Sequence, residues 1–315
     1  MRDRVYLLLF ILIVGALLYL GRDAIRSSEL MAWGLTFGGT TAIAILIVAM
    51  YRFRIQLEES RHELARKDAE IGFALKVQQA LFPRSFPTGR GLDFAAVCIP
   101  ARGISGDYYD AFFMPDGGLA FAIADVSGKG ISAAILMANL QALLRAVSLQ
   151  GTSPAQVCKM LNDHLCQVTQ ASQFATLFYA RWDPATRMLR YVNAGHNPPL
   201  LVNTAAIQLL TTGGMPLGMF PEAEYGTGET CLNVEDLIVL YSDGITEAGQ
   251  SDGRDFGEER LTSLVKAIRG LSLLDIQARI LASIRAWTSN EPEDDMTLVL
   301  VRALTFDSSS AGGVQ

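Results

Sequence analysis

Aspartates stand at the ends of four strand-like stretches of this sequence, and this residue type in that position favours metal chemistry. Three of the four sites also have a glycine or a second acid beside them. Oxygen ligands without a neighbouring histidine or cysteine are those that Mg²⁺ and Mn²⁺ prefer. The four sites are Asp107, Asp125, Asp243 and the pair Asp294–Asp295. One such aspartate would be an ordinary turn residue, but four together predict a carboxylate metal centre.

Two of these aspartates flank a predicted β-hairpin. The apolar runs 108–114 and 119–126 are separated by the sequence PDGG at 115–118, which is typical of a tight turn. Folding the hairpin back brings Asp107 and Asp125 close together. Burying two carboxylates that near each other is costly unless cations neutralise them. The alternative interpretation is that both are ordinary strand-end aspartates.

The elements around this hairpin predict an α+β fold. Apolar periodicity predicts helices over 131–149, 153–169, 258–269 and 273–287. Apolar runs predict further strands over 92–101, 174–182, 188–193, 199–202, 207–210, 237–241 and 296–304. Strands, then helices, then strands again, with turn-length connections, argue for α+β layers and against repeated βαβ units.

Seven motifs stand in a fixed order along the chain. They are SGDYYD (105–110), ADVSGKG (124–130), FATLFYA (174–180), YVNAGHNPPLL (191–201), GGMPLGMF (213–220), YSDGITEA (241–248) and DDMTLVL (294–300). Over roughly 72–303 the sequence resembles the SpoIIE-like, or RsbU-like, branch of the metal-dependent (type-2C) serine/threonine phosphatases. The acidic positions show no departure from that pattern. The resemblance implies a two-layer antiparallel β-sandwich flanked by helices, with metals at one edge.

The same resemblance implies a role for each acid, with Asp107 and Asp125 as catalytic residues. Asp125 would bridge two Mn²⁺ or Mg²⁺ ions, and the carbonyl of Val126 would bind one of them. Asp243 and Asp294 would hold the other ion, and Asp107 would bind a metal directly or lie beside one. We expect Asp294 rather than Asp295 to be the ligand of its pair. No covalent enzyme intermediate is required.

Four more residues near these motifs have two interpretations each. His196 is either a general acid or a residue that orders its loop, and the second is favoured. Lys129 lies near Asp125 in sequence, where it either attracts a phosphate or is a solvated lysine in a capping loop. Gly106 and Gly244 are either positions where the backbone approaches a ligand closely or plain turn glycines.

The sequence lacks the residues that two other mechanisms of phosphate-ester hydrolysis require. None of the four cysteines is followed by arginine six positions on, as a cysteine phosphatase requires, and no GxxxxGK[ST] loop occurs. What remains is a pair of divalent ions that activate water and clamp the phosphoryl oxygens. Two rival functions stay open, a catalytically silent signalling scaffold and a metal-dependent enzyme acting on nucleotides or phosphodiesters. The net charge of −6 gives no support for nucleic-acid binding.

The N-terminal part of the chain predicts a membrane anchor. The stretches 5–21 and 31–51 carry no charge, and each is close to the roughly 20 residues that cross a bilayer. Arginines flank the outer ends of the pair more than the short loop between them, which favours both chain ends in the cytoplasm. We therefore expect a multi-pass protein of the inner or plasma membrane, with a cytoplasmic phosphatase domain.

The resulting domain prediction has four parts. Residues 1–51 form the anchor, 52–83 a linker helix, 84–304 the phosphatase domain, and 305–315 a disordered tail. Within the linker, leucine or isoleucine recurs every seven residues at 57, 64 and 71, which predicts either a coiled-coil homodimer or a solvated connecting helix. Its last part resembles the regulatory helix of the family. The substrate implied by the resemblance is a small phosphorylated regulator such as a STAS-domain anti-anti-sigma factor.

Overall fold

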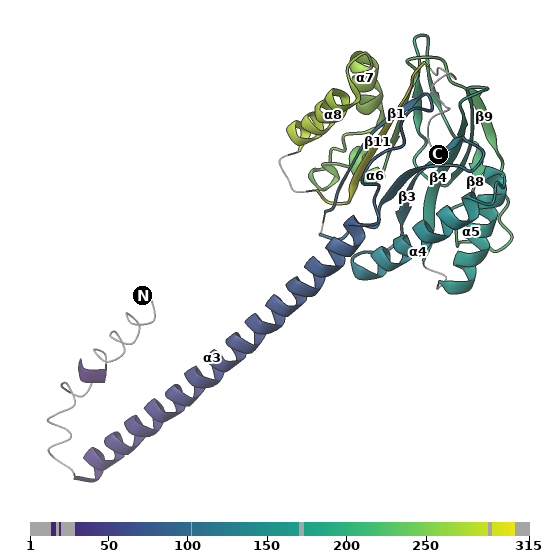
Figure 1. The fold of residues 1–315 in the computed structure, drawn as a ribbon. Helices are drawn as coiled ribbons and strands as arrows, with labels where there is room; N and C mark the ends of the chain where they lie inside the picture. Colours follow the sequence, from purple (N-terminus) through teal and green to yellow (C-terminus); the bar gives the residue numbers. More distant parts are fainter. Residues whose placement is uncertain are drawn as a thin grey trace. The chain divides into compact units, whose positions relative to one another are not determined.

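The computed structural model describes residues 14–16, 19, 29–101, 103–169, 173–288 and 292–305 (Figure 1). The predicted span 5–21 lies outside the described residues except at 14–16 and 19, and so does almost all of the predicted tail. The chain divides into two compact units, 1–69 and 70–315. The predicted domain boundaries stay predictions.

One long helix, α3 (Glu29–Gln79), contains both the predicted span 31–51 and most of the predicted linker. The helix is continuous across the expected junction, because no proline or glycine pair interrupts it there. Its apolar part is exposed, and it is long and apolar enough to cross a membrane. Helix α4 (Ile131–Ser148) passes the same test of length and composition among the described residues, yet its apolar face packs in the core of the second unit.

The second unit contains two β-sheets. The first sheet has the order β1 (Leu92–Ile99), β11 (Met296–Ala303), β10 (Leu237–Tyr241), β6 (Leu200–Val202), β7 (Ile207–Leu209). The second has the order β2 (Tyr108–Phe113), β3 (Leu119–Val126), β4 (Ala175–Asp183), β5 (Met188–Ala194), β8 (Gly213–Gly214), with β9 (Gly228–Cys231) also on β5. All strand pairs are antiparallel except the two-residue pairing of β5 with β8. The predicted antiparallel sandwich is confirmed with that exception.

Helices cover both outer faces of the sandwich (Figure 1). Helices α4 and α5 (Pro154–Val168) pack on the second sheet, and α7 (Glu258–Ile268) and α8 (Leu273–Trp287) pack on the first. A third apolar layer fills the space between the two sheets. Four layers therefore stack as helix, sheet, sheet, helix, and both sheets are buried on both faces.

Strand β3 shows why this sequence folds into layers. Phe121 and Ile123 contribute to the layer between the sheets, whereas Ala122 and Ala124 contribute to the layer under α4 and α5. This is the period-2 alternation of a strand, and the small alanine side chains let the helices approach closely. A strand that is buried on both faces has a nearly continuous apolar sequence, and β3 has one.

An ion pair between a partly exposed arginine and a buried aspartate links helix α4 to strand β2. Arg145 donates from Nε to Asp110 Oδ2 at 2.6 Å and from Nη2 to Oδ1 at 2.7 Å. The hydroxyl of Tyr108 donates to the same carboxylate at 2.7 Å, and the Asp110 side chain is fully buried. Two parallel hydrogen bonds from a guanidinium define orientation as well as distance. The pair therefore sets how α4 lies on the sheet.

The sequence did not predict several short elements, namely β8, β9, α6 (Asp243–Thr246) and the 3₁₀ turn η1 (Gln250–Asp252). Strand β8 consists of two glycines, which carry no strand pattern. A side chain at Gly213 would overlap the backbone of Asn193, so glycine is required by the close approach of β8 to β5.

Candidate metal centre

Four strand ends meet at one end of the sandwich, and each carries a predicted site residue. The β2–β3 register pairs Tyr108 with Ala124, so Asp107 and Asp125 follow as neighbours at the end of the hairpin. In the first sheet, Ser242 and Thr297 continue the β10–β11 pairing, so the end of β10 lies beside the start of β11. The antiparallel register thereby collects acids that are up to 188 positions apart in the sequence, from Asp107 to Asp295.

Asp107 and Asp125 lie between the two sheets and repel each other. Asp107 is 1% exposed, and its Oδ2 has no hydrogen-bond partner among the described residues. Burial, followed by the charge of Asp125, raises the pKa of Asp107 well above its usual value. Burial and then the charges of Asp243 and Asp294 raise the pKa of Asp125 to about 7. Both carboxyl groups therefore lack a compensating positive charge.

Asp243 faces this pair from the first sheet. It is the first residue of α6, directly after β10, and it is partly buried. Burial raises its pKa, and the neighbouring charge of Asp294 raises it further. The interaction of Asp125 with both Asp243 and Asp294 places acids of the two sheets within electrostatic reach of one another.

The neighbours Asp294 and Asp295 have different surroundings. Asp295 accepts hydrogen bonds from the backbone N–H of Ala101 at 2.8 Å and of Gly106 at 2.7 Å. Its carboxylate therefore holds the loop before β2 and is already satisfied. Asp294 is half exposed, and its Oδ2 lies 3.4 Å from Lys129 Nζ. That Asp294 rather than Asp295 is the metal ligand of the pair stays a prediction.

Two glycines allow the backbone to come close at this end. A side chain at Gly106 would lie 2.8 Å from the carbonyl oxygen of Val126. A side chain at Gly244 would overlap the carbonyl oxygen of Asp295. Neither glycine has a positive φ, so close contact rather than backbone conformation is the reason for glycine at both positions.

His196 is buried, with 5% of its surface exposed. Its Nδ1 is 2.8 Å from the hydroxyl of Thr176, and its backbone N–H donates to Asn193 Oδ1. Burial lowers the pKa of His196 to about 4, so the ring is neutral near neutral pH. A buried neutral imidazole suits the loop-ordering role better than that of a general acid.

The sequence reasoning missed two residues that position the acids. Gln78, in the last turn of α3, accepts from the backbone N–H of Ser105 at 3.0 Å and donates to its carbonyl at 2.5 Å. The hydroxyl of Ser105 then accepts from the backbone N–H of Asp107 at 2.9 Å. The only signal was that this part of the linker is more apolar than the rest. Which side chain makes the contact depends on the packing.

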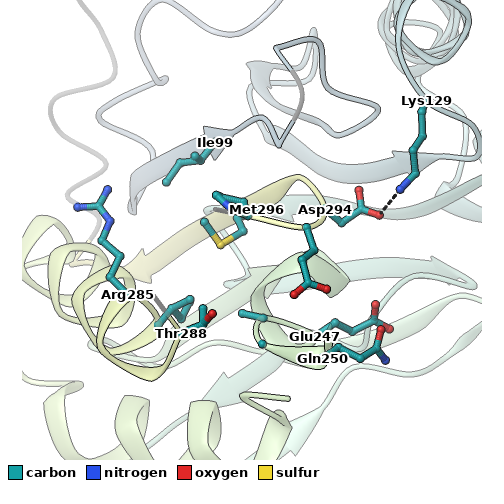
Figure 2. A pocket seen from close by; sticks show the side chains of 14 residues that line it. Ile99, Lys129, Glu247, Gln250, Arg285, Thr288, Asp294 and Met296 are labelled. Carbon is teal, nitrogen blue, oxygen red and sulfur yellow. Dashed lines mark hydrogen bonds and ion pairs between the residues drawn. The ribbon is translucent and has the colours of Figure 1, made fainter. Parts of the chain in front are cut away.

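Two cavities open at this end. A cavity of about 30 Å³ has Asp125, Lys129, Asp294 and Asp295 in its wall. A larger pocket of about 440 Å³ adjoins it and shares Lys129 and Asp294 (Figure 2). Apolar residues of β1, β11 and α8 line this pocket together with polar residues of the α6–η1 region, including Ile99, Ile284, Met296, Glu247 and Gln250. Of the predicted ligands, Asp294 lies in the wall of both cavities and Asp125 in that of the small one.

Comparison with known proteins identifies the family. The family model described as Stage II sporulation protein E (SpoIIE) matches residues 115–304, which is more than half of the chain. The chain belongs to the SpoIIE family. The resemblance that the seven motifs indicate is therefore confirmed, and the protein is by class a serine/threonine protein phosphatase, a hydrolase.

Relatives of this SpoIIE-family phosphatase include named phosphoserine phosphatases. It is 33% identical over 237 residues to the phosphoserine phosphatase RsbU of Bacillus subtilis, covering 74% of this chain and 70% of RsbU. It is 30% identical over 204 residues to the phosphoserine phosphatase RsbP of the same organism, covering 63% of this chain and 49% of RsbP. The chain thus spans more than two thirds of RsbU and about half of RsbP.

Solved structures support the same fold. The RsbU and RsbW domains of Rv1364c from Mycobacterium tuberculosis match with a TM-score of 0.63 at 27% identity, over 71% of this chain and 63% of that chain. The SiaA-PP2C domain of Pseudomonas aeruginosa matches with a TM-score of 0.67 at 19% identity, over 77% and 98%. RsbX, solved in complex with magnesium, matches with a TM-score of 0.53 at 17% identity, over 70% and 98%. These neighbours indicate a PP2C-type sandwich.

PP2C-type phosphatases depend on metal, and the residues of this SpoIIE-family chain suit hard cations. The converging groups are carboxylates, the donor type that hard cations prefer; Asp107 Oδ2 has no hydrogen-bond partner among the described residues, and burial raises the pKa of Asp125 and Asp243. In the described part of the chain, however, no three acidic, histidine or cysteine side chains are close enough to form a complete ligand set. The carboxylate oxygens are therefore suitable ligands for Mg²⁺ or Mn²⁺, but the described side chains are not arranged as a complete ligand set.

Proposed function

We propose that this protein is a membrane-anchored phosphoserine/phosphothreonine phosphatase that uses two Mn²⁺ or Mg²⁺ ions. The observation that carries the proposal is the convergence of four carboxylates from two sheets at one end of a PP2C-type sandwich, next to a pocket. Such a convergence has no structural purpose of its own, because like charges in a partly buried site destabilise the fold.

Each acid has a role in this proposal. Asp125 and the carbonyl of Val126 would hold one ion, and Asp243 and Asp294 would hold the other. Asp125 would also contact the second ion, and Asp107 would bind an ion directly or lie beside one. When bound, the ions lower the pKa of water and offset the charge of the phosphoryl group. Asp295 keeps the loop that carries Asp107 in place through its two backbone hydrogen bonds.

The proposed substrate is a phosphorylated serine or threonine in a small regulatory protein, such as a STAS-domain anti-anti-sigma factor. The names of RsbU and RsbP as phosphoserine phosphatases support the phosphoserine. The Mycobacterium tuberculosis protein with RsbU and RsbW domains supports a function together with an RsbW-type domain. The choice of a STAS-domain partner comes from the family resemblance.

Membrane attachment and dimerisation belong to the same proposal. The apolar, exposed first part of α3 supports a membrane-spanning helix, and the arginines at the outer ends of the two predicted spans support a phosphatase unit on the cytoplasmic side. Leu57, Leu64 and Ile71 are 43%, 58% and 40% exposed on α3, so the seven-residue repeat is available to a second copy.

The decisive experiment compares Asp125→Asn with the unaltered full chain in detergent. We expect Mn²⁺-dependent hydrolysis of p-nitrophenyl phosphate and of a phosphoserine protein by the unaltered chain, and its loss in the variant. Asp116→Asn is the matched control, because Asp116 lies in the turn at the opposite end of the same hairpin. Near-normal turnover by Asp125→Asn would refute the role given to this residue.

The alternative is a catalytically silent scaffold. The lack of a preassembled three-residue ligand set in the described part of the chain is the observation in its favour. Calorimetric titration of the full chain with Mn²⁺ distinguishes the two functions. Heat of binding that disappears in Asp125→Asn supports the enzyme, and the absence of any binding supports the scaffold.

A further inference from the structure

Lys129 occupies the junction between the small acidic cavity and the larger pocket. It follows β3 in the turn that leads to α4, and it is among the residues that line both cavities. Figure 2 shows its side chain reaching across to Asp294 on the opposite wall, with Arg285 at the far end of the pocket. Lys129, Glu293 and Asp294 are the residues that the two cavities share, so Lys129 lies where they meet.

The surroundings of Lys129 are strongly acidic. Asp125, Glu293, Asp294 and Asp295 line the small cavity with it, and Lys129 is the one basic side chain among the described residues of that wall. Glu247 adds a further carboxylate in the larger pocket, and Asp294 is among the charges that help raise its pKa, after burial and Asp243. Among the described residues of the small cavity, Lys129 alone offers a positive charge to an entering phosphate group; in the larger pocket Arg285 offers a second one, at the far end.

The contact between Lys129 and Asp294 is weak and exchangeable. Its N–O distance of 3.4 Å is longer than the usual 2.7–3.2 Å of a hydrogen bond, and the side chains are 58% and 50% exposed. Exposed pairs of this kind contribute little to stability, so Lys129 changes partner at little cost.

From this position we infer that Lys129 has two alternative partners, the carboxylate of Asp294 without bound cations and an oxygen of the substrate phosphate with them. The inference rests on the proposed function and adds a phosphate-contacting residue to it. With a cation bound at Asp294, Lys129 would lose this carboxylate as a partner, because the two positive charges would repel each other. The freed ammonium then faces the entrance from the pocket, where the phosphate arrives.

The two roles of Lys129 predict effects of opposite sign in Lys129→Met, studied in the full chain in detergent. Removal of a competing positive charge should make Mn²⁺ bind about two- to fivefold more tightly in calorimetric titration. Removal of a phosphate contact should raise the inhibition constant of inorganic phosphate about tenfold. This constant is measured in the hydrolysis of p-nitrophenyl phosphate, with the cation that supports hydrolysis present. Lys129→Arg should keep both constants near those of the unaltered chain.

Lys159→Met is the matched control. Lys159 also pairs with an aspartate, Asp163 at 2.8 Å, and its side chain is 42% exposed, but it lies on α5. Both constants should stay unchanged in this variant. Thermal unfolding of each variant reports whether it is folded, and Lys129→Gln serves as a second uncharged variant.

Three results would overturn the inference. Unchanged or weaker Mn²⁺ binding in the folded uncharged variants would mean that Lys129 does not compete for Asp294. Tighter Mn²⁺ binding with unchanged phosphate inhibition would mean that Lys129 is a counter-ion alone. If the unaltered chain shows no cation-dependent hydrolysis, both the proposed function and this inference are wrong. If it hydrolyses the substrate but the variants keep the same constants for Mn²⁺ binding and phosphate inhibition, only this inference is wrong.

Discussion

At the scale of single residues, this site is a group of carboxyl groups whose pKa values are raised first by burial and then by neighbouring negative charges. Asp107 has an unpartnered buried oxygen, and Asp125 and Asp243 are both harder to ionise than usual. A folded protein keeps such a group only if something else offsets its charge. Cations from solution would supply what the neighbouring residues do not.

The raised pKa values predict that the metal-free protein loses stability as the pH rises. A carboxyl group with a higher pKa in the folded state than in the unfolded state binds more protons when folded, so stability falls with pH between the two values. For Asp125 that window runs from about 4 to about 7. Scanning calorimetry of the metal-free full chain between pH 5 and 8 should show a falling Tm, by roughly 2–4 °C per kcal/mol lost.

Saturating Mn²⁺ should reverse this trend, because protons compete with the metal for the carboxylates. Asp125→Asn without metal should show a shallower decline than the unaltered chain, since one titrating group is gone. A Tm of the metal-free protein that rises across this pH range would contradict the assignment of these acids to one coupled site.

At the scale of elements, the site depends on how the end of β10 is attached to the start of β11. The hydroxyl of Ser242 donates to the carbonyl of Asp295 at 3.0 Å and accepts from the backbone N–H of Thr297 at 2.9 Å. Gly244 then packs directly against the backbone of Asp294 and Asp295. These contacts determine where Asp243 and Asp294 stand relative to each other.

Gly244→Ala should therefore reduce activity far more than a plain turn glycine would. Its new methyl group would overlap the carbonyl oxygen of Asp295 and push away the loop that carries Asp294. A displacement of about 1 Å at a catalytic group can cost about 100-fold in rate. Hydrolysis of p-nitrophenyl phosphate by the full chain measures the loss.

Gly270→Ala is the control for this change, because a side chain at Gly270 meets nothing within 4 Å and the residue has no positive φ. Its activity and Tm should match those of the unaltered chain. Equal activity of both variants would show that the close approach at Gly244 does not set the geometry of the site.

The elements also show how far local sequence patterns reach. Strand β3 and helix α8 begin and end at the predicted residues, because apolar periodicity is strong in both. Strands β8 and β9 went unpredicted, since their glycine and polar residues take strand geometry only from pairing with β5. Pairing partners that are distant in sequence leave no local pattern.

At the scale of the whole molecule, the chain combines a compact α+β unit with a long helix whose first part is apolar. The first 69 residues form a unit of their own, and the second unit begins at Glu70, within the last turns of α3. The phosphatase unit thus includes the last turns of this helix, whose Gln78 contacts the loop before Asp107.

If the first part of α3 spans the membrane, as proposed, the full chain should stay in the membrane pellet after an alkaline carbonate wash, because its exposed apolar surface would lie in lipid. A variant lacking residues 1–51 should move to the soluble fraction. Immunoblotting of the two fractions measures both. Recovery of the full chain in the soluble fraction would contradict the membrane anchor.

The sequence by itself determined the family, the α+β class, most strand and helix positions, and the identity of the acids. These features depend on local periodicity and on motifs whose order is preserved along the chain. The tertiary structure alone decided that Asp295 holds a loop, that Gln78 reaches Ser105, and that Lys129 meets Asp294. These contacts join residues 27 to 194 positions apart, and only the tertiary packing of helix α3, the strand ends and the loops brings such residues together.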